Sequence, residues 1–259
     1  MRRPDADAAA SKARAGFSLI EILVAISLIA IVAGALAPAG IRSLRAAQAE
    51  KTRARMDAAL RGLIGDPERG DFGYLGDLGA LPASLNDLND GAGKPAYALN
   101  ATDGVGYGWA GPYAPTLAIA GVALVDAWGM PFQYTGSAQL RSAGPDRAFA
   151  SADDLVRPPL ALATTGNLVV TVLGIPSGGG TPIQLDTARV DVFVASSNAG
   201  VRNEQALAGA GPYTATNLHL GLHALRAVGL GAWAGAPVVR DVVAIKRGAS
   251  SRTLVLEQP

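Results

Sequence analysis

A single carboxylate interrupts a long apolar run near the start of the chain. The run covers 21 residues, from Phe17 to Ala37, and Glu21 is its fifth residue and its only charged one. An acid in a spanning helix costs about 2.5–3.5 kcal/mol near the middle and less near the end, so it needs a cationic partner. If the chain were cut after Gly16, the new ammonium group of Phe17 would lie one helical turn from Glu21, at i and i+4.

One long helix is expected to position this carboxylate. Apolar side chains continue past the run at three- and four-residue steps, which is the spacing of one helical face. They are Ile41, Leu44, Met56, Leu60, Leu63 and Ile64. We expect a helix over residues 17–64, about 70 Å long, ended by Gly65 and Pro67. Its apolar part is long enough for a bilayer core, and Pro38, which lacks an amide proton, is expected to kink or locally unwind it.

A second cluster of carboxylates lies in the middle of the chain. Asp146, Asp153 and Asp154 fall within nine residues, where they repel one another unless a cation lies between them. Calcium takes six to eight oxygen ligands and accepts both carboxylates and backbone carbonyls. The alternative is a solvated acidic turn in which Asp146 and Asp153 accept hydrogen bonds from nearby amides. The residues alone leave both open.

The N-terminal segment resembles that of prepilins and pseudopilins, which carry a class III signal. The matching residues are Gly16 before the cut, Phe17 as first mature residue, Glu21 as the fifth and Pro38 as the twenty-second, after a short basic leader. The resemblance implies cleavage by a prepilin peptidase and N-methylation of Phe17. It also implies assembly into a helical filament in which Glu21 neutralises another subunit's N-terminus.

Two simpler interpretations compete with this resemblance. Ala35-Leu36-Ala37 is similar to a signal-peptidase site, but Pro38 would then follow the cut, and the helical pattern continues beyond it. A plain membrane anchor would need no glutamate. Orientation is not fixed by charge, because four cations precede the run and five follow it soon after. Placement of the later residues outside the inner membrane therefore depends on the resemblance alone.

The middle of the chain resembles the head domain of the major pseudopilin of type II secretion. The shared features are a turn-and-strand segment over 126–134 and a loop that ends in the Asp153-Asp154 pair. The resemblance implies a calcium loop with side-chain ligands from Asp146, Asp153 and Asp154 and carbonyl ligands from Ala143 and Ser151. This chain departs from the family at three positions, where Ala127 replaces proline and Arg147 and Ala150 replace glycines. If either glycine normally has positive φ, its replacement is strained. Trp128 and Phe132 are expected in the core rather than at a ligand.

The last third of the chain is predicted to form a small antiparallel β-sandwich. Short apolar or alternating segments are separated there by glycine-rich turns. They are 168–172, 190–194, 213–216, 222–228, 238–245 and 253–256. The run 211–227 is weakly similar to transthyretin-like and carboxypeptidase-regulatory-like sandwiches, which concerns the fold only. Such modules usually bind or brace other proteins rather than catalyse.

These observations predict an α+β protein with five consecutive parts. A long N-terminal transmembrane or pilin helix packs on a small loop-rich β head domain, and the sandwich follows. The predicted parts are a leader at 1–16, the helix at 17–64, the head with its calcium loop at 65–157, a linker at 158–166 and the sandwich at 167–259.

Composition excludes several functional classes. A formal net charge of +1 argues against binding nucleic acid through bulk charge. The absence of cysteine excludes thiol chemistry and disulfides. His219 and His223 are the only histidines, and an i, i+4 pair can bind zinc on a helix, but their segment is predicted as strand or turn and offers no third ligand. No catalytic constellation is evident, so we expect no enzyme.

The sequence therefore predicts a structural subunit of a type II secretion pseudopilus. Its expected location is the inner membrane, with a single pass and C-terminal domains in the periplasm. Its expected partners are copies of itself, minor pseudopilins, prepilin peptidase and the inner-membrane secretion platform. Three alternatives stay open: a type IV pilin or minor pilin for adhesion, motility or DNA uptake; an anchored binding module; and an enzyme in the appended domain.

Overall fold

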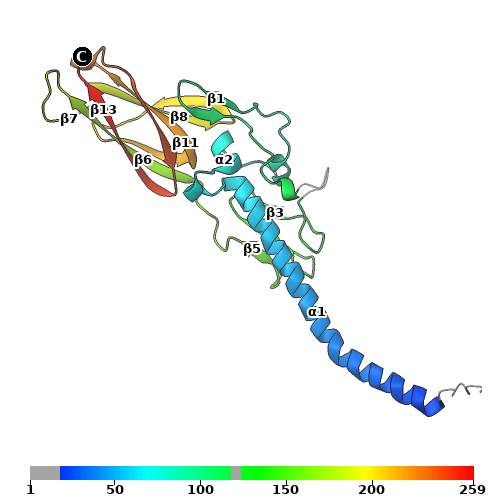
Figure 1. Cartoon of the computed structure of the whole chain (residues 1–259). Coiled ribbons are helices and arrows are strands. Elements are labelled where there is room, and N and C mark those ends of the chain that lie inside the picture. The colour runs from blue at the N-terminus through cyan, green and yellow to red at the C-terminus, as the bar shows by residue number, and fades with distance from the viewer. Residues whose placement is uncertain (1–17, 118–123) are drawn as a thin grey trace, which may run out of the picture. The chain divides into compact units, whose positions relative to one another are not determined.

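The computed structural model describes residues 18–117 and 124–259. The chain divides into two compact units, residues 1–47 and 48–259. The long helix α1 (Leu19–Ile64) contributes to both units and is continuous through Pro38 (Figure 1). Of the two effects expected at Pro38, a kink or local unwinding, the unwinding does not occur. A proline removes only one amide proton, and the flanking turns keep their hydrogen bonds.

The C-terminal end of α1 forms part of the core of the second unit. Met56, Ala59 and Leu63 are fully buried there, while Ile64 is nearly so, as the three- and four-residue spacing predicts. The helix ends at Gly65, whose φ of +64° is left-handed. A Cβ at this position would lie 2.3 Å from the carbonyl oxygen of Asp71, so the turn requires glycine.

The head domain is built from short elements and loops, as its glycine content predicts. Its helices are η1 (Pro67–Arg69), α2 (Gly73–Leu78), η2 (Leu85–Leu88) and η3 (Pro115–Leu117). Its strands are β1 (Ala98–Asn100), β2 (Val105–Tyr107), β3 (Gln133–Tyr134), β4 (Leu140–Ser142) and β5 (Leu155–Arg157). β1 pairs with β2, and β3-β4-β5 form an antiparallel sheet. The helix α2 was not expected from its glycine-rich sequence and is held by packing rather than by helix propensity.

The remaining strands form two sheets that share one core. One sheet has the order β12-β11-β8-β9, and the other has the order β10-β6-β13 with β7 also paired to β6. Their bounds are β6 (Thr165–Ile175), β7 (Ile183–Gln184), β8 (Val190–Asn198), β9 (Val201–Ala206), β10 (Tyr213–His219), β11 (Gly221–Gly229), β12 (Val239–Ile245) and β13 (Gly248–Glu257). Each of the six predicted segments overlaps a strand, and β7 and β9 were missed.

The sandwich differs from the prediction in one pairing. β13 pairs with β6 in parallel, with Gly248 opposite Gly166 and Glu257 opposite Ile175, so the sandwich is mixed rather than purely antiparallel. The other pairings in it are antiparallel. Buried side chains alternate along β6 and β8 and meet those of the opposite sheet in a single hydrophobic cluster. This alternation is the period-two signal that revealed the strands.

Head and sandwich belong to the same compact unit and are packed together. The Ser197 hydroxyl of β8 donates to the carbonyl of Asp77 in α2 at 2.7 Å, and the Gly200 amide donates to the carbonyl of Leu78 at 3.2 Å. Leu220, between β10 and β11, is fully buried and belongs to the hydrophobic cluster of the head rather than to that of the sandwich. The chain after 157 is therefore docked on the head and completes its core.

Candidate functional site

The assembly residues predicted from the sequence lie at the start of α1. Gly16 and Phe17 fall outside the described residues. Glu21 lies in the first turn of α1, and its amide donates to the Ser18 hydroxyl at 3.2 Å. Ser18 and Glu21 have the spacing of a capping box, in which serine satisfies a free amide at the helix start. The Glu21 side chain itself makes no hydrogen bond to a described residue and is exposed.

The first turns of α1 expose an unusual amount of apolar surface. Leu19 is 82% exposed and Ile20 is 72% exposed. α1 is long and apolar enough to cross a membrane, and the most apolar part of it is not buried. Such a surface requires lipid or other helices around it. These properties fit a single-pass membrane anchor, although a signal sequence would have the same length and composition.

The acidic loop lies between β4 and β5 and is closed by its own carboxylates. The Ser151 hydroxyl donates to the Asp153 carboxylate at 2.5 Å and lies 3.3 Å from that of Asp154. The Asp146 amide donates to Asp153 at 3.2 Å. The Ser151 hydroxyl and the Asp146 amide together hold the pKa of Asp153 below its usual range, despite the opposing effect of desolvation. The loop is thus arranged to favour the ionised form of Asp153.

Two residues of this loop have a backbone conformation that favours glycine. Arg147 has φ of +60° and Ala150 has φ of +69°, which is the left-handed region that a Cβ disfavours by about 1–2 kcal/mol. These are the two positions at which the resembled family has glycine. Both residues therefore have the positive φ for which strain was predicted from the sequence.

The structure brings only some of the predicted calcium ligands together. Asp153 and Asp154 converge on Ser151, whereas the Asp146 carboxylate accepts the Ala148 amide at 2.9 Å. The Arg141 guanidinium lies 3.7 Å from Asp154 and partly neutralises the loop. Among the residues described, no group of three or more acidic, histidine or cysteine side chains is close enough to hold a metal ion. Bound calcium would therefore need the Asp146 side chain to turn inward, and carbonyls such as that of buried Ala143 to complete the set.

The turn before β3 is organised by a residue that the sequence did not single out. The Asp126 carboxylate is buried and accepts the amides of Trp128 and Met130 at 2.9 Å each. It also accepts the Ser142 hydroxyl at 2.6 Å, which links the turn to β4. Phe132 is buried in the head core, as predicted, whereas Trp128 is only half-buried. The sequence feature that could have revealed this role of Asp126 is its position directly before a turn that contains Trp128 and Gly129.

Two polar residues of α1 hold this turn against the helix. The Arg55 guanidinium donates to the carbonyls of Val125 and Asp126 at 3.0 and 2.9 Å. The Thr52 hydroxyl, on the same face, is fully buried and accepts the Ala127 amide at 3.1 Å. An apolar pattern cannot reveal such contacts, because they depend on backbone groups that lie far away in the sequence.

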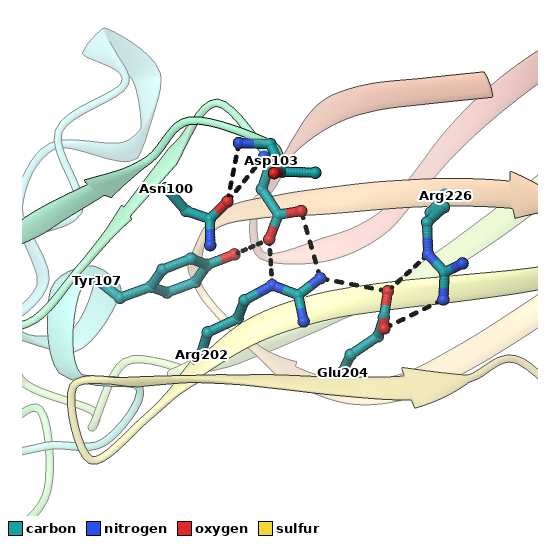
Figure 2. Close-up of polar contacts among 7 residues, drawn as sticks. Asn100, Asp103, Tyr107, Arg202, Glu204 and Arg226 are labelled. Carbon is teal, nitrogen blue, oxygen red and sulfur yellow. Dashed lines mark hydrogen bonds and ion pairs between the residues drawn. The ribbon is translucent and has the colours of Figure 1, made fainter. Parts of the chain in front are cut away.

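A network of ion pairs connects the head to the sandwich. Figure 2 shows Arg202 of β9 lying between Asp103, which precedes β2, and Glu204 of β9. Glu204 in turn accepts two hydrogen bonds from Arg226 of β11, at 3.0 and 3.1 Å. The Tyr107 hydroxyl donates to Asp103 at 3.1 Å. We call Asp103, Arg202, Glu204 and Arg226 the junction network.

Comparison with known proteins bears on the N-terminal segment. Residues 11–37 match the family model described as a prokaryotic N-terminal methylation motif. The N-terminus of this chain is prepilin-like. The match spans the predicted cut, Glu21 and the apolar run, and it confirms the class of N-terminal signal that the residues indicated. It covers no residue of the head or the sandwich.

Two solved structures share a slight likeness with the chain. One is GBS52, the minor pilin of the Gram-positive pathogen Streptococcus agalactiae, at 12% identity and a TM-score of 0.28, covering 49% of this chain and 63% of that one. The other is the Bacillus anthracis TIE protein, at 15% identity and a TM-score of 0.27, covering 50% and 24% respectively. This chain thus spans less than two thirds of either structure, and at these scores neither likeness carries an argument. No curated protein matches the chain.

Proposed function

We propose that this protein is a structural subunit of a type II secretion pseudopilus. The observation that carries the proposal is Glu21, a carboxylate in the first turn of an exposed apolar helix that matches the N-terminal methylation motif. A cut after Gly16 would supply the cation that this acid needs. Prepilin peptidase would make the cut from the cytoplasmic side, and Phe17 would then be methylated.

The mechanism is mechanical rather than chemical. Before assembly, lipid covers the apolar half of α1, and after assembly the same surface packs against the helices of other copies and of minor pseudopilins. Subunits leave the inner membrane at the secretion platform and add to the filament base, and growth of the filament pushes cargo outward through the periplasm. No residue in this scheme is catalytic, so we propose a function without enzymatic activity.

The sandwich is proposed to contact cargo or another component of the machine. It is docked on the head through hydrogen bonds and the junction network, so it would keep a fixed position relative to the head when the subunit is part of a filament. Calcium, if bound at Asp146, Asp153 and Asp154, would stabilise the loop between β4 and β5, and we retain it as part of the proposal.

The decisive measurement is the intact mass of the protein purified from membranes. Loss of residues 1–16 together with the gain of one methyl group is expected. A mature protein that begins at Pro38, or one that retains its first 16 residues, would refute the proposal.

Assembly is tested separately by Glu21→Ala, with Glu50→Ala as its matched control. Glu50 lies on the same helix, is mostly exposed and pairs only with Arg53 among the described residues, at 3.4 Å. Filaments recovered from cells should disappear in the Glu21 variant and persist in the Glu50 variant. Filaments that persist with Glu21→Ala would contradict the assembly role of Glu21, whereas a protein that forms no filaments and keeps its membrane anchoring and partner binding in this variant would favour the anchored binding module.

A type IV pilin or minor pilin is the second candidate, because the methylation motif is common to both classes of filament. Long surface filaments, or loss of twitching or of DNA uptake on deletion of the gene, would favour it. Loss of protein export alone would favour the pseudopilus.

A further inference from the structure

A buried and a half-buried histidine lie together at the junction of head and sandwich. His219 ends β10 and His223 lies in β11, with ring centroids 4.5 Å apart. His223 is fully buried. The proposed function assigns no role to either residue.

The hydrogen bonds indicate that both rings are neutral. Nε2 of His223 lies 2.9 Å from the carbonyl of His219, and Nδ1 of His219 lies 3.1 Å from the carbonyl of Leu220. Since a carbonyl can only accept, these nitrogens carry the protons. The other two, Nε2 of His219 and Nδ1 of His223, are buried and have no partner among the described residues. Protonating Nδ1 of His223 would create a buried charged donor without an acceptor among the described residues.

The pair lies where α2 of the head covers one end of the sandwich. A Cβ added to Gly221 would fall 3.2 Å from the Cα of Gly76 in α2 and 3.2 Å from Cε1 of His219. Gly221 precedes His223 by two residues on the same face of β11. Leu220, between the two histidines in sequence, is buried in the head core. Separation of head and sandwich would therefore admit water to these rings.

We propose that His219 and His223 make the junction between head and sandwich sensitive to acid. In the closed junction the rings stay neutral, and in an opened junction they take up protons. Acid therefore stabilises the open form.

The other ionisable groups of the packed elements are few. α2 contributes Tyr74 and Asp77, β2 contributes Tyr107, and β6 contributes none. On β12, Val243 faces His223, and Asp241, two residues along, is paired with Arg252 at 2.8 Å. On β8, the ionisable Asp191 lies at the far end of the pairing, opposite Val228. After burial, the ionisable side chain that most disfavours protonation of His223 is the neighbouring imidazole of His219.

Asp77 acts in the opposite direction. Burial raises the pKa of its carboxyl to about 6, although the Tyr113 hydroxyl, 2.8 Å away, opposes the rise. A raised carboxyl pKa favours the closed junction as the pH falls through that value, because the closed form then binds the proton more tightly. Asp77 therefore offsets part of the junction opening that protonation of the histidines causes, so the test includes a variant without the Asp77 carboxyl.

The size of the effect follows from proton linkage. Burial, and secondarily the neighbouring His219, lower the pKa of His223 to about 3, whereas an exposed histidine titrates near 6.5. Between pH 7.5 and 5.0 this difference raises the opening constant about 30-fold. Asp77 reduces opening by at most about 10-fold over the same range, and by less because its carboxyl is partly solvated. The net increase expected for the natural protein lies between about 3- and 30-fold.

Hydrogen exchange of the full chain in detergent micelles measures this opening directly. The amide of Gly200 donates to the carbonyl of Leu78 across the junction, so peptides that contain Gly200 report on it. Rates at pH 7.5 and 5.0 are corrected for the intrinsic effect of pH. Peptides from β6, within the sandwich core, serve as the control for global unfolding.

Three proteins are compared. The variant His219→Asn/His223→Gln keeps a donor near each original position but cannot titrate, and we expect its exchange at Gly200 not to rise at pH 5.0. Asp77→Asn removes the opposing carboxyl, and its increase should approach 30-fold. The proposal is overturned if the double variant keeps the increase of the natural protein, or if the natural protein shows none.

A second measurement is independent of any substitution. His219 and His223 are the only histidines in the chain, so two imidazole signals in an NMR pH titration belong to them. We expect that the signal of His223 does not shift between pH 8 and about 5. Two ordinary titrations near pH 6.5 would refute the proposal.

Discussion

Removal of Arg202 tests how firmly the junction network joins the head to the sandwich. The Asp103 side chain is 5% exposed, and Arg202 donates two hydrogen bonds to it. Arg202→Ala would leave that carboxylate with the Tyr107 hydroxyl as its remaining side-chain donor among the described residues. Losing one partner of a fully buried ion pair costs about 3–5 kcal/mol. Because the Arg202 side chain is 32% exposed, water can replace part of the interaction, and we expect about 2 kcal/mol.

The assay is guanidinium unfolding of the full chain in micelles, followed by tryptophan fluorescence. The matched control is Arg189→Ala, because Arg189 and Asp186 are 3.9 Å apart and both nearly half exposed. Loss of that pair should cost at most about 0.5 kcal/mol. If Arg202→Ala and Arg189→Ala differ by less than about 0.5 kcal/mol, the reasoning on the junction network is wrong.

The pH dependence of this cost provides an internal check. Burial opposes ionisation of Asp103, but the hydrogen bonds and charge of Arg202 outweigh it, so the pKa of Asp103 is lowered. Stability from a lowered carboxyl pKa is present above the unfolded value of about 3.9 and is lost as the pH falls through the folded value. The difference between the natural protein and Arg202→Ala should therefore shrink below about pH 4. A difference that grows in acid would contradict the assignment.

Three further outcomes are expected from thermal or chemical unfolding. Gly79→Ala should destabilise the protein by more than about 2 kcal/mol, because its Cβ would lie 2.0 Å from the carbonyl oxygen of Ser197 in the sandwich. The control is Gly93→Ala, which also has positive φ but nothing within 4 Å, and it should cost about 1 kcal/mol. Equal effects of the two substitutions would contradict the close approach at Gly79. Arg147→Gly or Ala150→Gly should each stabilise by about 0.5–1 kcal/mol, since both have positive φ; destabilisation would show that the side chain matters more than the strain. Calcium should raise the unfolding midpoint relative to chelator and should lose this effect in Asp153→Asn; a midpoint that ignores calcium would remove the ion from the proposal.

The fold was largely predictable where burial follows a regular period. The apolar spacing of α1 revealed its end at Ile64, and the alternation in 168–172 and 190–194 revealed β6 and β8. β9 was missed because it is an edge strand with polar residues and little buried surface. The parallel pairing of β13 with β6 was also missed, because a strand's alternation does not encode which neighbour it pairs with.

The candidate site was predictable only in part. Glu21 stood out because a charge in an apolar run is rare, and the three aspartates stood out because they are crowded. Asp103 and Arg202 gave no signal, since they are 99 residues apart and charged residues are usually solvated. His219 and His223 stood out only as a possible zinc pair, and their place at the junction depends on α2 (Gly73–Leu78), a helix that its glycine-rich sequence did not predict.

Leu220 has a consequence for how the protein can be divided. Its side chain packs in the hydrophobic core of the head, although it follows β10 of the sandwich in sequence. A shortened chain that ends before the sandwich would therefore have a cavity in the head core at the position of this leucine. A cavity of that size typically costs about 2–5 kcal/mol, a large part of the stability of a small domain. A truncated head would then be prone to misfolding for reasons unrelated to export. Substitutions on the outer surface of the sandwich, rather than its removal, are the sound way to ask what it touches.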